Sequence, residues 1–270
     1  MTSHTVFTIV ACSVLTLWGI AFVGYLPPVA RRLRVPLGPI AFALGWVVMI
    51  GYMAWLWQVL DRVPMRTQGE TRLWYTLFLP AIGLVVEWRW RTKTMAIPTI
   101  VMAMVFLIIT LGHPETLDKS LMPALNSPWF APHVIVYMVS YATLGVAAAL
   151  SGWALLQHFF KPGTNLEKTV DEARRLVYIG FPFMTLGMIL GAIWGKIAWG
   201  HYWSWDPKET WAFMTWAMYL AYLHLDRYTK LSSRAQLMLV TGAFLVLLGC
   251  WFGVNALPSA QMSVHTYSAN

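Results

Sequence analysis

The chain has 270 residues, of which 58% are hydrophobic and only 11% are charged. This composition excludes an ordinary soluble domain and is typical of a protein that crosses a membrane several times. The formal net charge of +8 is therefore attributed to basic cytoplasmic loops rather than to nucleic-acid binding. Cys12 and Cys250 lie in apolar segments and form no C-x-x-C pair, which argues against a thiol redox site or a zinc site.

Apolar segments of roughly the 20 residues needed to span a bilayer recur along the chain. They cover about 6–28, 38–60, 73–88, 94–112, 133–160, 175–195, 207–227 and 236–256, of which 73–88 is the shortest. The first is interpreted as a retained span rather than a signal peptide, because no basic residue precedes it and its apolar run is long. The sequence thus predicts an all-α, polytopic integral membrane protein with about eight transmembrane helices.

The distribution of basic residues predicts that both termini lie outside. Alternating from an outside N-terminus, the inner loops hold thirteen of the nineteen basic residues: Arg31, Arg32, Arg34, Arg89, Arg91, Lys93, Lys161, Lys168, Arg174, Arg175, Arg227, Lys230 and Arg234. The outer loops hold Arg62, Arg66, Arg72, Lys119, Lys196 and Lys208, so loop 61–72 contributes half of the exceptions. An excess of Lys and Arg on the inside is the expected bias.

The predicted topology divides the chain into two parts. Residues 1–112 are expected to form the first four transmembrane helices. Residues 113–270 are expected to hold an outer loop 113–132, helices five to eight, and a tryptophan-rich loop 194–211 on the outer side. Four prolines in 113–132 exclude one continuous helix there.

The tryptophan-rich stretch reads W-G-K-I-A-W-G-H-Y-W-S-W-D-P-K-E-T-W, and its five tryptophans are Trp194, Trp199, Trp203, Trp205 and Trp211. Indoles are favourable at a membrane–water boundary, but this density predicts a flat aromatic surface suited to a planar ligand such as a porphyrin. A dense interfacial anchor is the alternative. Asp206-Pro207-Lys208-Glu209 forms a capping-box pattern at the start of span seven, which favours a structural over a catalytic role for Asp206 and Glu209.

Three histidines are candidate ligands. His133 at the mouth of span five and His265 in the outer tail lie at the level of the tryptophans, and two imidazoles are what six-coordinate haem iron needs. Solvated polar residues are the alternative. His224 lies 17 residues beyond Pro207, roughly 25 Å deeper at the helical rise, where an ionisable residue indicates a functional site. An interfacial histidine beside Asp226 and Arg227 is the alternative. His158 lies at a similar depth and is a candidate second inner ligand, although the Phe159, Phe160 and Lys161 that follow it favour an interfacial role.

These residues together resemble a known family. The strip is similar to the tryptophan-rich WWD signature of haem-handling proteins in cytochrome c maturation. D-P-K-E-T-W, A-F-M-T-W and Y-L-H (222–224) resemble the CcsA (ResC) family of system II cytochrome c synthase subunits most closely. A-P-H-V (131–134), F-G-V-N-A-L-P and H-T-Y extend the match, which covers about 125–270.

The resemblance implies a haem export and delivery subunit that presents haem b on the outer face for attachment to the C-x-x-C-H segment of apocytochrome c. It implies that His133 and His265 are axial ligands at the WWD site and that His224 is a ligand of an inner haem site. It implies a CcsB/ResB-like partner subunit, a thiol-reducing thioredoxin-like protein and membrane lipid as partners, and a location in the bacterial cytoplasmic membrane. The residues offer no obvious acid or base, so the expected contribution to the synthase is the positioning of haem.

Two alternatives stay open. One is a CcmC-like system I haem lyase that passes haem to a chaperone, although that signature diverges after W-D. The other is a membrane scaffold or regulator without haem of its own.

Overall fold

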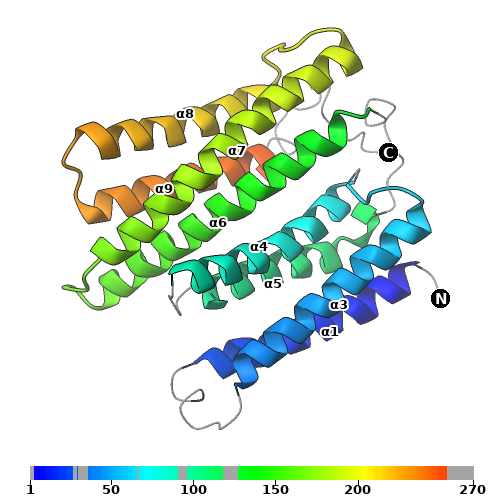
Figure 1. The fold of residues 1–270 in the computed structure, drawn as a ribbon, viewed down its shortest axis with the longest axis horizontal. Helices are drawn as coiled ribbons and strands as arrows, with labels where there is room; N and C mark the ends of the chain where they lie inside the picture. The colour runs from blue at the N-terminus through cyan, green and yellow to red at the C-terminus, as the bar shows by residue number, and fades with distance from the viewer. Residues whose placement is uncertain are drawn as a thin grey trace. The chain divides into compact units, whose positions relative to one another are not determined.

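The computed structural model describes residues 3–26, 29, 36–65, 67–90, 96–117 and 127–253 (Figure 1). Within these ranges the regular structure is entirely helical, which confirms the predicted fold class. The described α-helices are α1 (Ser3–Tyr25), α3 (Leu37–Leu60), α4 (Gln68–Trp90), α5 (Ala96–Gly112), α6 (Phe130–Phe160), α7 (Glu167–Trp199), α8 (Pro207–Tyr228) and α9 (Ser233–Leu248). A 3₁₀ turn η1 (Pro114–Leu117) follows α5, and a π-helical turn η3 (Gly249–Gly253) extends α9.

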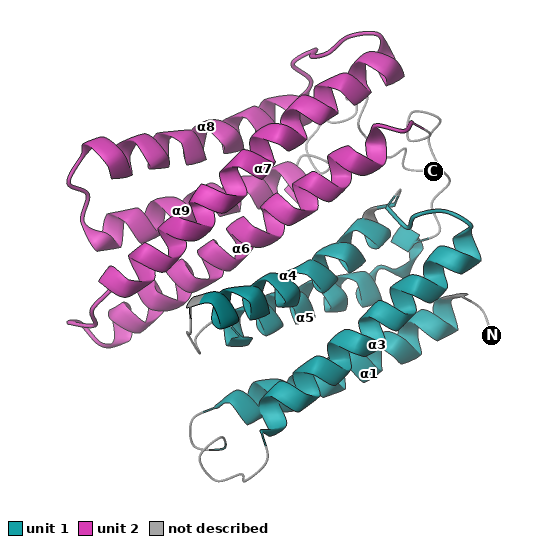
Figure 2. Ribbon diagram, in the orientation of Figure 1, with its two compact units in different colours: residues 1–121 teal, residues 122–270 magenta. Residues whose placement is uncertain are grey.

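The chain divides into two compact units, Met1–Leu121 (unit 1) and Met122–Asn270 (unit 2) (Figure 2). In unit 1, α1 packs along α3, α4 packs along α5, and α5 also contacts α1. In unit 2, α6 and α7 form the most extensive helix pair, and α9 contacts α6, α7 and α8. Every residue described in the candidate site below belongs to unit 2.

Small residues allow the helices of each unit to approach closely. In unit 1, a Cβ atom on Gly24 would lie 2.6 Å from the backbone nitrogen of Gly38. In unit 2, a Cβ atom on Gly180 would lie 2.8 Å from Cγ of Leu144. Helices inside lipid gain little from apolar burial against one another, so close van der Waals contact at small residues stabilises their packing.

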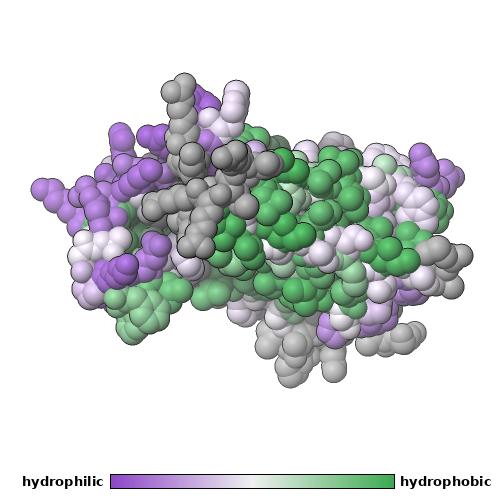
Figure 3. Space-filling model, turned by 90° about the horizontal axis from the view of Figure 1, so that it is seen from below, coloured by the Kyte–Doolittle hydropathy of each residue, from purple (hydrophilic) through white to green (hydrophobic). Residues whose placement is uncertain are grey.

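Five of the described helices are long and apolar enough to cross a membrane: α1, α3, α6, α7, and α9 together with η3. The apolar helix α5 has 17 residues, and α4 and α8 carry more charge, so these three remain spans by prediction. On the face drawn in Figure 3, hydrophobic side chains cover the middle and hydrophilic ones gather toward the ends. The chain is therefore a multi-pass membrane protein with one helix at each predicted position.

Six of the described helices begin earlier than the sequence predicts, α7 and α4 by the largest margins. The helix α4 starts at Gln68 rather than 73, α6 starts at Phe130 rather than 133, and α7 starts at Glu167 rather than 175. Pro132 lies in the first turn of α6. N–H groups in a first turn have no intrahelical acceptor, so the missing N–H group of proline costs no helix hydrogen bond. Charged and proline residues ended the predicted spans, but they are compatible with helix ends that emerge from the apolar region.

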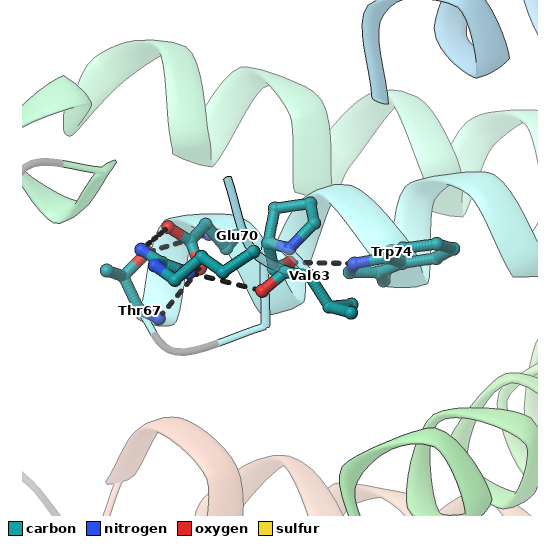
Figure 4. Close-up of polar contacts among 6 residues, drawn as sticks. Val63, Thr67, Glu70 and Trp74 are labelled. Carbon is teal, nitrogen blue, oxygen red and sulfur yellow. Dashed lines mark hydrogen bonds and ion pairs between the residues drawn. The ribbon is translucent and has the colours of Figure 1, made fainter. Parts of the chain in front are cut away.

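The start of α4 is fixed by a polar cluster in the loop that precedes it (Figure 4). The Glu70 N–H group donates to Oγ1 of Thr67 at 3.1 Å, and the Thr67 N–H group donates to Oε2 of Glu70 at 3.3 Å, which makes a capping box. Arg62 donates to both carboxylate oxygens of Glu70, at 2.9 and 2.7 Å. Nε1 of Trp74 donates to the carbonyl oxygen of Pro64 at 2.7 Å. Arg62, one of the basic exceptions to the charge rule, is thus neutralised by an adjacent carboxylate.

Candidate functional site

The tryptophan-rich stretch is not a single loop, contrary to the sequence-based expectation. Trp194 and Trp199 lie in the last turns of α7, and Trp211 lies in the second turn of α8. The connection between the helices is residues 200–206. It begins at Gly200, whose φ of 86° is the left-handed conformation that ends α7, with its N–H group bonded to the carbonyl oxygen of Lys196. The helix continues through Gly195 to Trp199, and it ends where Gly200 adopts the left-handed conformation.

The predicted capping box at the start of α8 is confirmed. Oδ1 of Asp206 accepts the Glu209 N–H group at 2.8 Å, and Oε2 of Glu209 accepts the Asp206 N–H group at 3.3 Å. Pro207 occupies the first helical position. The same Oε2 atom accepts the Ser204 N–H group at 2.7 Å. Both carboxylates therefore organise the connection between α7 and α8, as a structural role requires.

Trp205 lies between these capping bonds in an unusual conformation. Its φ of 60° is rare for a residue with a side chain. The residue is 62% exposed, so burial of its side chain does not account for the conformation. The capping bonds on either side hold the backbone there and present the indole at the surface of unit 2.

The five indoles do not share one plane, and the expectation of a single flat surface is wrong. The rings of Trp194 and Trp199 meet at 65°, and those of Trp203 and Trp205 meet at 84°. Trp211 packs against η3, since a Cβ atom on Gly249 would lie 2.9 Å from its ring. The sequence places these residues near one another but cannot give their ring orientations, because those depend on packing between helices.

His133 lies in the first turns of α6 and faces α7. Its Nδ1 atom is 2.8 Å from the carbonyl oxygen of Gly187, and its ring stacks on that of Trp194 with centroids 5.6 Å apart. A carbonyl oxygen can only accept, so Nδ1 carries a proton, and in the neutral imidazole Nε2 keeps its lone pair. Metal-binding histidines are commonly fixed in this way by a hydrogen bond from their other ring nitrogen.

Glycines of α7 provide the space for this imidazole. A Cβ atom on Gly191 would lie 2.6 Å from Cε1 and 2.9 Å from Nδ1 of His133. One on Gly187 would lie 3.0 Å from the ring of Tyr137. The two glycines are one turn apart and so lie on the same side of α7.

A row of aromatic rings continues from His133, and the sequence-based interpretation missed it. The distance between ring centroids is 4.9 Å from His133 to Tyr137, 5.1 Å from Tyr137 to Tyr141, and 5.8 Å from Tyr141 to Trp251 of η3. The spacing of four residues from 133 to 137 to 141 puts the first three on one side of α6. This spacing is the feature of the sequence from which the row of aromatic rings could be predicted.

His224 lies near the other end of unit 2. Arg174 in the first turns of α7 donates to Asp226 at 2.9 Å, which holds the C-terminal end of α8 beside the N-terminal end of α7. Trp194 is 20 residues further along α7, about 30 Å away at the helical rise. The His224 ring is exposed, and Nδ1 donates to the carbonyl oxygen of Leu220 at 2.9 Å. The structure therefore does not bring His224 together with His133.

Two further observations concern possible ligands of this region. Nε1 of Trp203 is buried and has no hydrogen-bond partner among the residues described. Within those same ranges, no group of three or more His, Cys, Asp or Glu side chains comes together that could hold a metal ion. His265 lies outside the described residues.

Comparison with known proteins identifies the family. The model of the Cytochrome C assembly protein family matches residues 6–260. A protein described as "Cytochrome c biogenesis protein CcsA" from Prochlorococcus marinus (strain MIT 9312) is 36% identical, with 78% of each chain covered. A protein of the same description from Chlamydomonas reinhardtii is 34% identical, with 72% of this chain and 55% of that protein covered.

Among solved structures, "Cytochrome c Heme Lyase CcmF" aligns with a TM-score of 0.69 at 17% identity. The alignment covers 93% of this chain and 47% of that one, so the chain spans about half its length. At this identity the likeness concerns the fold alone. By the family match and the sequence relatives, the chain belongs to the cytochrome c assembly protein family, as a CcsA-type cytochrome c biogenesis protein.

Proposed function

We propose that this protein holds haem b at the α7–α8 end of unit 2 and delivers it to apocytochrome c. Membership of a cytochrome c assembly family supports this role. In the proposal the chain is the CcsA-type half of a cytochrome c synthase, and a CcsB/ResB-like membrane subunit supplies the other half. The proposed location is the bacterial cytoplasmic membrane, with the α7–α8 connection on the outer side and a thioredoxin-like protein keeping the apocytochrome thiols reduced.

The observation that carries the proposal is the hydrogen bond from Nδ1 of His133 to the carbonyl oxygen of Gly187. It leaves Nε2 as the nitrogen with a lone pair, which is the form of imidazole that binds iron. Trp194 stacks on this ring and covers one of its faces. The unpaired N–H group of Trp203 suits an acceptor such as a haem propionate. The residues present therefore fit haem.

The chain contributes binding and orientation to the reaction. Bound haem supplies vinyl groups, to which the cysteine thiols of the C-x-x-C-H segment add to form thioethers. His133 and His265 are the proposed axial ligands. The indoles of Trp194, Trp199, Trp203, Trp205 and Trp211 surround the site, and Asp206 shapes it through the cap of α8. Positioning of reactants in this way is a sufficient source of rate acceleration when the groups themselves are reactive.

The direct test replaces the proposed axial ligands. His133→Gly and His265→Gly should each reduce cytochrome c formation at least tenfold, about the effect of disturbing a metal site, and should alter the visible spectrum of the purified protein. Millimolar imidazole should partly restore cytochrome c formation and the visible spectrum, because it is small enough to occupy the position that the histidine vacates. The matched control is His113→Gly, since His113 is exposed and pairs with Glu115. A wild-type spectrum and normal assembly in either variant would show that the residue is not a ligand.

His224 is proposed to be a ligand of a second haem site at the opposite end of α8, with its partner ligand on the CcsB/ResB-like subunit. Its exposure and its Nδ1 hydrogen bond support this role, because Nε2 is left with its lone pair. His224→Ala should lower the amount of haem that copurifies with the complex, whereas His201→Ala should not. Normal haem content together with failed cytochrome c assembly would contradict a role in haem entry.

A further inference from the structure

A pocket of about 460 Å³ lies at the end of unit 2 that is remote from the α7–α8 connection. The last turns of α6, the loop after it and the first turns of α9 form its walls. Its lining residues are Leu155, His158, Phe159, Pro162, Arg234 and Met238. None of these belongs to the proposed haem sites, so the pocket needs a separate explanation.

Two lining residues carry unused hydrogen-bonding capacity. Nδ1 of His158 is buried, and no described residue accepts from it or donates to it. The exposed Arg234 forms no ion pair with any residue that the structure describes, whereas the nearby Arg174 pairs with both Asp171 and Asp226. Buried polar atoms are normally satisfied, and a guanidinium has the geometry to bind phosphate through two N–H groups. The pocket therefore suits an anion.

The remaining walls select an amphiphilic anion. Leu155, Phe159 and Met238 are apolar, and Phe159 and Met238 are 76% and 48% exposed as residues. They lie in the terminal turns of membrane-spanning helices, at the level where the apolar region meets the headgroups. Apolar surface beside a cation at this level matches an acyl chain that continues from a phosphate group.

We propose that this pocket binds an anionic phospholipid of the adjacent leaflet. The phosphate is held by Arg234 and His158, and an acyl chain lies against Leu155, Phe159 and Met238. Because α6 and α9 both contribute, the bound lipid links the ends of these helices. The proposal does not depend on haem binding, since none of the residues that line the pocket is a proposed haem ligand.

The test measures binding of dihexanoyl phosphatidylglycerol to the purified full-length protein in neutral detergent, by native mass spectrometry and by thermal shift. Arg234→Gln should weaken this binding about tenfold or more, because a hydrogen bond to a charged group is worth about a factor of ten. His158→Leu should weaken it less. Arg227→Gln is the matched control, since Arg227 is an exposed arginine at the end of α8, before the loop that leads into α9 and outside the pocket.

Two ligand controls separate the sources of the anion. Dihexanoyl phosphatidylcholine should bind more weakly than phosphatidylglycerol, and sodium phosphate at the same concentration should neither bind measurably nor compete. Equal binding of the zwitterionic lipid would overturn the role of charge, and effective competition by phosphate would make this a site for soluble anions. Unchanged phosphatidylglycerol affinity in a folded Arg234→Gln protein would remove the proposal altogether.

Discussion

At the scale of single residues, His133 is determined as much by α7 as by its own helix. The hydrogen bond to Gly187 fixes which nitrogen carries the proton, the Trp194 ring covers one side, and the absence of a side chain at Gly191 leaves room for the imidazole. A residue that binds iron must be held in one orientation to be effective. This environment therefore makes α7 a supporting element of the proposed haem site.

A methyl group at position 191 tests this dependence. In Gly191→Ala the new Cβ would lie 2.6 Å from Cε1 of His133, so the ring must move and the bond to Gly187 must lengthen. Loss of such a supporting bond should weaken haem retention by about tenfold or more, measured as haem per protein after purification. The control is Gly152→Ala in α6, where nothing lies within 4 Å and the protein should be as stable or slightly more so. Wild-type haem retention in Gly191→Ala would contradict the proposed support.

At the scale of elements, the positions of the eight helices were predictable because apolar runs of spanning or nearly spanning length recur along the chain. The start of α8 was also predictable, since Asp206, Pro207 and Glu209 form a local pattern. The extent of α7 through Trp199 was not, because the density of tryptophans in 194–211 predicts a loop at the membrane boundary between two spans. The start of α4 could have been found from Thr67 and Glu70, which form the same capping pattern.

The candidate site was predictable only in part, because local sequence patterns do not determine how side chains from different helices pack. His133 could be chosen from its position at a helix end, but its proton arrangement depends on a carbonyl 54 residues away in the chain. The angle between the Trp203 and Trp205 rings likewise depends on a left-handed backbone at Trp205, which no local pattern predicts. Local rules specify helix ends, whereas ring orientation depends on tertiary packing.

The cap of α8 gives a prediction at this scale. Asp206→Ala removes the side chain that accepts the Glu209 N–H group, which should lower the free energy of unfolding by about 1 kcal/mol. For a chain of this size that corresponds to a melting temperature about 2–4 °C lower, measured on the purified protein in detergent. Asp206→Asn, which keeps an accepting oxygen, should remain close to wild type. An equal loss in both variants would show that the negative charge, rather than the cap, stabilises the helix.

At the scale of the whole molecule, the distribution of charge is what orients the chain in the membrane. Loop 61–72 seemed to oppose the proposed orientation because it holds three basic residues. Arg62 is paired with Glu70 in this loop, and Arg72 is only 7% exposed, so neither is a solvated cation. The positive-inside rule counts Lys and Arg residues and gives little weight to nearby carboxylates. The pairing of Arg62 therefore leaves loop 61–72 as an exception, and the orientation itself remains a prediction.

Cysteine labelling tests the orientation with two positions on unit 2. Ser204, in the α7–α8 connection, and Thr164, in the loop before α7, are both exposed. The 33 residues of α7 separate them by about 50 Å, so they are expected on opposite sides of the membrane. In a background with Cys12 and Cys250 replaced by alanine, Ser204→Cys should react with a membrane-impermeant maleimide in intact cells.

Thr164→Cys should react with the same reagent only after lysis, because the proposal places its loop in the cytoplasm. Each protein serves as the control for the other, since a leaky membrane would label both positions before lysis. Labelling of Thr164→Cys but not of Ser204→Cys in intact cells would reverse the orientation. It would place His133 and the tryptophans on the cytoplasmic side, where apocytochrome c could not receive haem after export, and the proposed delivery function would fail with it.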